Sequence, residues 1–367
     1  MLTARPALIF LMALSLASFS IAAGQQRRDP DQDDVIRLKS DLVTVTASVT
    51  DTSGRALKSL RATDFVIYED GVRQKIEHFA ATEEPFSLML LLDISGSTAE
   101  DISLIKRAAR EFIDQLRDRD RVGVIVFSRD VEVIAEFTDS RPRVEAAIES
   151  LYSAQGNLTH RYTSKTGTSF YDALYLAAEE SPLRRAEGRK AIVCMSDGVD
   201  STSKMKYDEV VGLVERAEAT LYFLQLNTEE VTRAGLVKPR TDPGFINLSQ
   251  SQVDRYFDTY DPNSPDRQKP RATFTADELT GMNRGLYELA RRDMRQTAER
   301  TGGRVYPVRS LSDLSGVYKQ IADDLRTQYS IGYYPANAER DGRWREIRVE
   351  VLPKGATVRA RSGYWAK

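Results

Sequence analysis

Apolar and hydroxyl residues alternate strictly between Val43 and Val49, where Val43, Val45, Ala47 and Val49 are separated by Thr and Ser. This period of two predicts a strand with one buried face. Apolar residues in the stretches 65–68 and 75–79 flank Asp70-Gly71, a dipeptide that favours a tight hairpin turn. The segment 41–81 is therefore predicted to be all β.

The pattern changes at Phe86, where residues 86–92 are almost continuously apolar. Such a run is typical of a strand buried on both faces of a parallel sheet. Helical and strand patterns then alternate along the chain, which favours a doubly wound α/β domain with a mostly parallel sheet over residues 82–327. A polar stretch with several prolines, residues 227–275, interrupts this rhythm and is predicted to be an inserted loop.

Three further β-segments are predicted within residues 328–367. Each end of the chain supplies only a few strands with one apolar face, and small isolated sheets are marginal in water. We therefore expect both ends to build one β-sandwich-like domain that flanks the α/β domain. The arginines of this region are spaced largely by strand alternation and are expected on a solvated sheet face: Arg343, Arg345, Arg348, Arg359 and Arg361.

The first 24 residues have the features of a secretory signal peptide. Arg5 supplies the positive charge, residues 7–19 form an apolar segment too short to span a bilayer comfortably, and small residues follow at 20–24. We expect an exported protein, periplasmic or secreted, with a flexible segment at 25–40. No membrane span is predicted after leader cleavage.

Composition excludes several classes of function. The chain has 367 residues, with 52 Lys and Arg against 54 Asp and Glu, so it lacks the basic character of a dedicated nucleic-acid-binding protein. One Cys and two His are too few for a disulfide scaffold or a Cys/His zinc site. A Cys–His catalytic pair is excluded for the same reason.

Oxygen-bearing side chains follow the buried strand at Asp93, Ser95 and Ser97. Ligands bind at the carboxyl ends of strands in open α/β sheets, so this loop lies where a site is expected. Two other segments add candidates: Thr168 precedes a predicted helix, and Asp197 follows another buried strand. Carboxylate and hydroxyl oxygens suit Mg²⁺, Mn²⁺ or Ca²⁺.

Together these residues resemble the complete metal-ion-dependent adhesion site of a von Willebrand factor type A domain, and the resemblance covers about residues 85–327. The segments 65–71 and 329–335 are similar to those of an exported bacterial family related to this domain. The resemblance implies that Ser95 and Ser97 bind the cation directly, Thr168 directly or through water, and Asp93 and Asp197 largely through water. It also implies a protein partner that presents an Asp or Glu carboxylate to the metal.

Two alternatives remain open at this stage. Asp93 and Asp197 around a cation would also suit a metal-dependent phosphoester hydrolase, although no Lys or Arg clamp, His base or nucleophile is evident in the loops. The same loops would also suit a structural envelope protein without metal. We expect a non-enzymatic interaction module.

Overall fold

The computed structural model describes residues 42–81, 85–96, 102–151, 167–186, 188–242 and 244–366. The predicted signal peptide, the segment 25–40 and the candidate ligand Ser97 lie outside these ranges. Among the described residues no helix has the length and hydrophobicity needed to cross a membrane.

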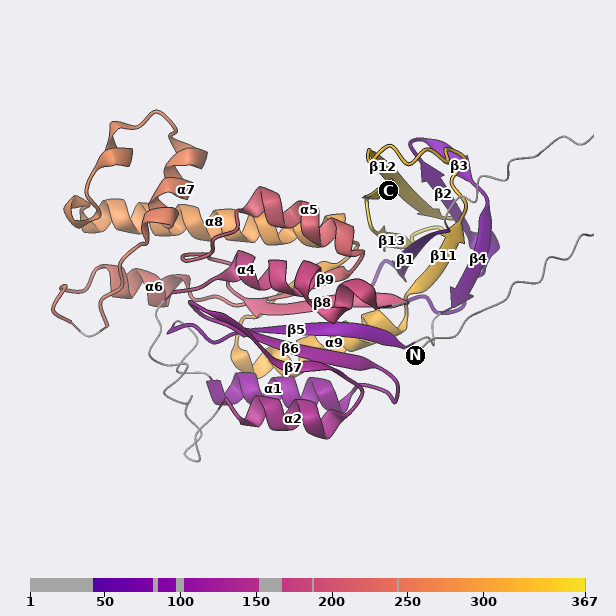
Figure 1. Cartoon of the computed structure of the whole chain (residues 1–367), viewed down its shortest axis with the longest axis horizontal. Coiled ribbons are helices and arrows are strands. Elements are labelled where there is room, and N and C mark those ends of the chain that lie inside the picture. Colours follow the sequence, from indigo (N-terminus) through magenta and orange to yellow (C-terminus); the bar gives the residue numbers. More distant parts are fainter. Residues whose placement is uncertain are drawn as a thin grey trace, which may run out of the picture. The chain divides into compact units, whose positions relative to one another are not determined.

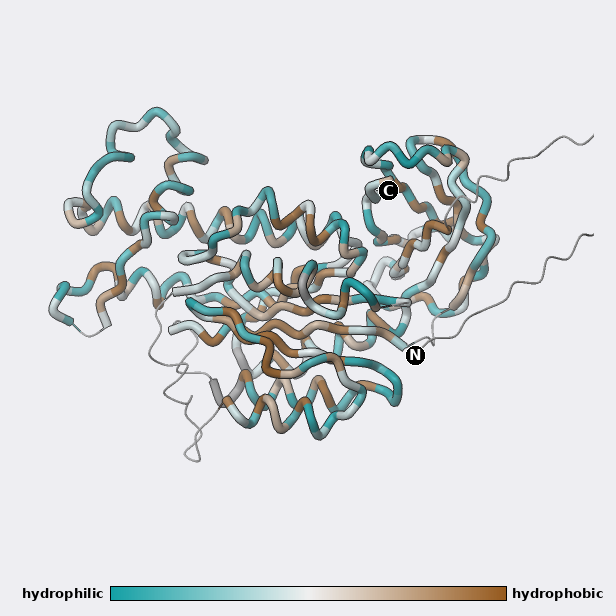
Figure 2. The backbone as a smooth tube through the Cα atoms, viewed as in Figure 1, coloured by the Kyte–Doolittle hydropathy of each residue, from teal (hydrophilic) through white to brown (hydrophobic). Residues whose placement is uncertain are grey.

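A six-stranded sheet in the order β10-β9-β8-β5-β6-β7 forms the centre of the α/β region. Its strands are β5 (Phe86–Asp93), β6 (Arg121–Phe127), β7 (Val131–Thr138), β8 (Arg189–Ser196), β9 (Thr220–Gln225) and β10 (Arg304–Pro307). All neighbouring strands pair in parallel except β7, which pairs antiparallel with β6. Every residue of β5 is buried, as expected for a strand covered on both faces, and the apolar sheet stands out in Figure 2.

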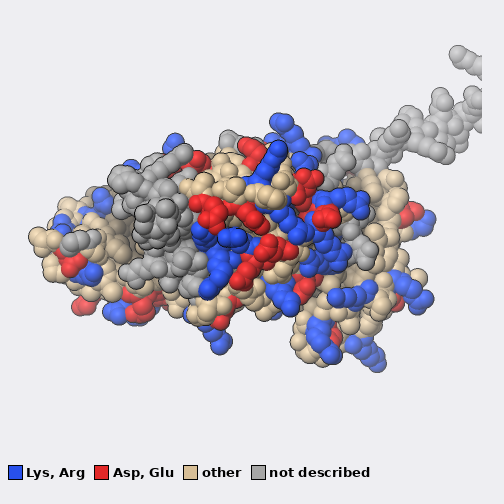
Figure 3. Space-filling view, turned by 90° about the horizontal axis from the view of Figure 1, so that it is seen from below, with Lys and Arg blue, Asp and Glu red and all other residues tan. Residues whose placement is uncertain are grey.

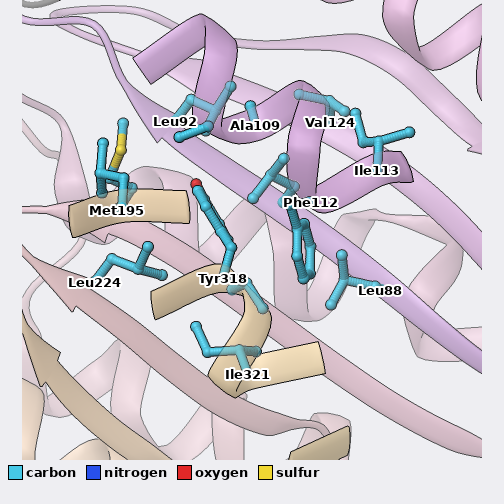
Figure 4. Close-up of a cluster of buried hydrophobic side chains, with 14 of the residues drawn as sticks. Leu88, Leu92, Ala109, Phe112, Ile113, Val124, Met195, Leu224, Tyr318 and Ile321 are labelled. Carbon is cyan, nitrogen blue, oxygen red and sulfur yellow. The ribbon is translucent and has the colours of Figure 1, made fainter. Parts of the chain in front are cut away.

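Helices cover both faces of this sheet (Figure 1). One face carries α1 (Ile102–Asp114), α2 (Arg141–Glu149) and α9 (Leu314–Arg326); the other carries α4 (Phe170–Tyr175), α5 (Tyr207–Ala217) and α8 (Ala276–Arg300). Figure 4 shows the core between the sheet and the helices α1, α2 and α9. In it the rings of Phe112 and Tyr318 stack with centroids 4.7 Å apart. The predicted doubly wound α/β class is confirmed.

Shorter turns of helix complete the description. The 3-10 turns are Ala62–Asp64, Pro182–Arg185, Pro265–Gln268, Arg271–Thr273 and Leu311–Asp313, and a π-helical stretch spans Leu176–Glu180.

Strands from both ends of the described chain form two four-stranded sheets. One has the order β13-β1-β11-β4 and the other β14-β12-β2-β3. Their bounds are β1 (Val43–Thr50), β2 (Phe65–Glu69), β3 (Val72–Gln74), β4 (Ile76–Ala81), β11 (Tyr329–Tyr333), β12 (Trp344–Val351), β13 (Thr357–Ala360) and β14 (Gly363–Trp365). Buried residues of β1, β2, β11 and β12 share one core, so the sheets pack face to face as a sandwich.

Two expectations for this sandwich need correction. The hairpin at Asp70-Gly71 joins β2 to β3, but residues 76–81 leave it and pair with β11 in the opposite sheet. The predicted solvated row of arginines is also wrong in part, because Arg345 is only 5% exposed and Arg359 pairs with Asp324 of α9. The alternating pattern of a strand assigns a residue to one face of the sheet, but it does not show whether water or another part of the protein covers that face.

Residues 228–275, here termed the inserted lobe, contain two helices rather than an irregular loop. These are α6 (Glu229–Leu236) and α7 (Gln250–Tyr260), and both contact α8 (Figure 1). Ser249 and Gln252 form a capping box at the start of α7. A small core joins the lobe to α8 through Leu236, Leu248, Val253, Phe257, Phe274, Leu279, Met282 and Leu286.

Charged side chains of both signs are intermixed on the face shown in Figure 3. Glu149 of α2, for example, pairs with both Lys106 and Arg110 of α1. This mixture agrees with the near-zero net charge and offers no extended basic surface on that face.

Candidate functional site

Two aspartates stand at the carboxyl ends of neighbouring parallel strands. Asp93 is the last residue of β5, and Asp197 directly follows Ser196, the last residue of β8. The Ser196 hydroxyl donates to Asp93 Oδ2 over 2.6 Å, which links the two strand ends. Asp93 Oδ1 accepts the backbone N–H of Ser95 at 3.0 Å, so the turn after β5 folds back toward its own strand end.

Both carboxylates are removed from solvent, with Asp93 1% and Asp197 6% exposed. Burial, reinforced by the charge of Asp197, raises the pKa of Asp93 to about 7. Burial also raises the pKa of Asp197 above its ordinary value. Both shifts have the same physical cause, because water reaches neither carboxylate to stabilise its ionised form.

Asp197 is held by donors from three places in the chain. Its Oδ1 accepts the backbone N–H of Val199 at 2.9 Å. Its Oδ2 accepts the hydroxyls of Thr228, which precedes α6, and of Tyr287 on α8, the latter at 3.3 Å. The lobe and the helix beneath it therefore reach the candidate site directly.

Thr168 lies in a loop that is anchored on both sides. Its carbonyl accepts the backbone N–H groups of Ser201 and Thr202 at 2.9 and 3.2 Å, and its own N–H donates to the Ser201 hydroxyl at 2.7 Å. The next residue, Ser169, donates its N–H to the Ser128 carbonyl at the end of β6. This loop is thereby fixed between the end of β6 and the loop that follows Asp197.

Four of the five predicted ligands fall within the described residues, namely Asp93, Ser95, Thr168 and Asp197. The structure joins Asp93, Ser95 and Asp197 around two linked strand ends and holds Thr168 against the loop after Asp197. Among the described residues there is no group of three or more His, Cys, Asp or Glu side chains suited to a metal. A site here would combine two carboxylates with hydroxyls, a donor set that fits a hard divalent cation.

Sequence reasoning missed Thr228 and Tyr287. Thr228 falls in the stretch that was predicted to be an inserted loop, and Tyr287 lies 59 residues further along, on a helix whose pattern gives no sign of the site. The Thr-Glu-Glu sequence at 228–230 is a helix-start signal that would have placed Thr228 beside the end of β9. The sequence holds no comparable signal for Tyr287.

Comparison with known proteins finds one family model that matches part of the chain. Residues 88–199 match the family model described as von Willebrand factor type A domain, and all five predicted ligands lie within the matched stretch. An uncharacterized protein of Borreliella burgdorferi is 24% identical over 167 residues, which cover 43% of this chain and 45% of that protein. The chain therefore matches less than half the length of this curated relative.

Solved structures give a weaker likeness. The conserved hypothetical protein BatB from Bacteroides thetaiotaomicron is 20% identical, with 65% of this chain and 98% of that chain covered at a TM-score of 0.40. A von Willebrand factor type A protein from Catenulispora acidiphila is 12% identical, with coverage of 89% and 74% and a TM-score of 0.39. The one family model that matches the chain is not that of an enzyme family.

Proposed function

We propose that this chain is an exported, divalent-cation-dependent protein-binding module of the von Willebrand factor A type. The observation that carries the proposal is the pair of buried carboxylates, Asp93 and Asp197, at the linked ends of β5 and β8. Two like charges in a poorly solvated place destabilise the site, and a divalent cation between them would offset that repulsion.

The residues that would hold the cation are Asp93, Ser95, Ser97, Thr168 and Asp197. When bound, the cation would supply an electrophilic centre for a carboxylate from a protein partner. With hydroxyls as the direct ligands and the two carboxylates acting largely through water, the cation would keep a position for an Asp or Glu carboxylate of the partner. Mg²⁺, Mn²⁺ and Ca²⁺ are all suited to this oxygen set, and no catalytic step is proposed.

Cation binding by purified protein tests the first half of the proposal. We expect calorimetry to detect Mn²⁺ or Mg²⁺ binding at one site, and Asp93→Ala or Ser95→Ala to abolish it. The matched control is Asp208→Ala, which removes an exposed carboxylate from the first turn of α5 and should bind cation normally. Equal binding by the wild type and both site variants would overturn the assignment.

Partner capture tests the second half. Immobilised protein should retain a partner from envelope extract in Mg²⁺ and release it in EDTA, whereas Asp197→Ala should retain none in either buffer. Retention that ignores EDTA would favour a metal-free structural role, and turnover of a phosphoester by the wild type alone would favour the hydrolase. Cell fractionation and the mass of the mature chain test export, with cleavage expected near Gly24.

A further inference from the structure

The hydrogen bonds at Asp197 Oδ2 come from the first residue of the inserted lobe and from α8. Thr228 stands immediately before α6, and Tyr287 lies on α8 beneath the lobe. Their hydroxyls also contact each other, with 2.8 Å between Thr228 Oγ1 and Tyr287 Oη. Thr232, one turn into α6, adds a third hydroxyl 2.9 Å from Tyr287 Oη.

The number of hydroxyl protons determines the direction of each hydrogen bond in this cluster. Each hydroxyl has one proton to donate, and Asp197 in the ionised form that binds a cation can only accept. Thr228 donates to Asp197, Tyr287 donates to Asp197 or to Thr228, and Thr232 is left to donate to Tyr287. The result is a directed chain of hydrogen bonds that runs from α6 through α8 to the candidate ligand.

Packing fixes the positions of these donors. Tyr287 is 3% exposed and Thr228 is 7% exposed, so both side chains are largely shielded from water. The ring of Tyr287 is carried by the long helix α8, which shares the small core of the lobe. The donors to Asp197 are therefore held in position by packing. Outer-shell residues orient the ligands of a metal in the same way.

The lobe is also attached on the other side of the site. Ser251 of α7 donates its hydroxyl to the Ser201 carbonyl at 2.8 Å, and Ser201 is the residue that binds the Thr168 backbone. Arg255 of α7 pairs with the buried carboxylate of Asp293, and its guanidinium lies 5.1 Å from the centre of the Tyr171 ring. The lobe thus contacts the loop after Asp197 directly and is connected to Thr168 through Ser201.

We propose that Thr228 and Tyr287 are positioning residues through which the inserted lobe sets the carboxylate of Asp197 for cation binding. The inference rests on the proposed function and deepens it, because it assigns the lobe to the metal site. Outer-shell hydrogen bonds of this kind affect metal affinity by roughly 10- to 100-fold. Loss of the lobe's donors should therefore weaken the cation site without unfolding the α/β region.

The test compares Mn²⁺ affinity in the full chain by calorimetry for the wild type, Tyr287→Phe and Thr228→Val. We expect each variant to bind Mn²⁺ at least about 10-fold more weakly. The matched control is Tyr222→Phe, which removes a buried tyrosine hydroxyl from a different carboxylate, Asp324, and should bind Mn²⁺ as the wild type does. Melting in EDTA reports any loss of fold separately from the loss of affinity.

A second measurement separates positioning from mere packing. Addition of Mn²⁺ should slow amide hydrogen exchange in α6 of the wild type, because the fixed carboxylate then holds Thr228, and Tyr287→Phe should reduce this protection. Unchanged affinity in both variants, together with Mn²⁺ binding by the wild type, would overturn the inference alone. Absence of Mn²⁺ binding in the wild type would overturn the proposed function and the inference together.

Discussion

Arg359 of β13 forms two hydrogen bonds, 2.8 and 2.7 Å long, with the carboxylate of Asp324 near the end of α9. The same carboxylate accepts the hydroxyl of Tyr222 on β9 at 2.8 Å, and Arg359 also donates to the Gly303 carbonyl. One arginine of the β-sandwich therefore contacts a helix and a loop of the α/β region. Both bonds to Asp324 come from the Nη2 group of Arg359, so this ion pair is also a charge-assisted hydrogen-bonded pair.

Replacement of Arg359 should destabilise the folded protein. The Asp324 side chain is 10% exposed, so Arg359→Ala would leave a largely buried carboxylate without its cation. We expect a loss of about 2 kcal/mol in the free energy of unfolding, measured by urea denaturation. Lys75→Ala, which breaks an exposed pair with Glu77, is the control and should cost less than about 1 kcal/mol. Equal losses in the two variants would contradict this explanation.

Separation of the chain at the domain boundaries gives a second prediction. The central strand β1 pairs with β11 on one side and β13 on the other, so residues 42–81 lack both partners when isolated. Residues 82–327 keep the whole six-stranded sheet and its helices. We expect the fragment 82–327 to melt cooperatively and the fragment 42–81 to give no cooperative melt in circular dichroism; a sharp transition in the shorter fragment would refute the prediction.

The sequence predicted those parts of the fold that have the same kind of surroundings along their whole length. A strand such as β5 meets apolar side chains on both faces, and its unbroken run of hydrophobic residues records that environment directly. The fold class and the strand-end position of Asp93 and Asp197 follow from such patterns. The inserted lobe was missed because its prolines obscured two short helices, although Ser249 and Gln252 carry a capping signal for α7.

Contacts between distant segments were the part that sequence could not supply. Lys75 separates β3 from β4, which belong to different sheets. The sequence around Lys75 gives no signal that the chain passes there from one sheet to the other. Arg359 fits strand alternation equally well whether it faces water or Asp324. Tyr287 reaches Asp197 from 90 residues away. In each case the partner is chosen by tertiary packing, which a local pattern does not encode.

Gly198 provides a test of how tightly the loop after Asp197 is packed. Its φ is +78°, and an added Cβ would lie 2.5 Å from Met294 Sδ. Gly71 has the same φ in the β2–β3 turn, with open space around it, so it is the matched control. We expect Gly71→Ala to cost about 1 kcal/mol from backbone strain alone and Gly198→Ala at least about 1 kcal/mol more from the added clash. Urea denaturation in EDTA measures both, and similar losses would show that the Met294 side chain yields freely.

Asp93→Asn should change stability with opposite sign in the absence and presence of cation. The substitution keeps the size of the side chain and a group able to bond the Ser196 hydroxyl, but it removes one of two buried negative charges at the strand ends. In EDTA at pH 8 the variant should therefore be more stable than the wild type, by about 1–2 kcal/mol. With Mn²⁺ in excess the order should reverse, since the wild type gains the free energy of cation binding and the variant gains little of it. Melting temperatures of both proteins in the two buffers give the answer. If the wild type is the more stable protein in EDTA as well, the repulsion between Asp93 and Asp197 is not what the cation relieves.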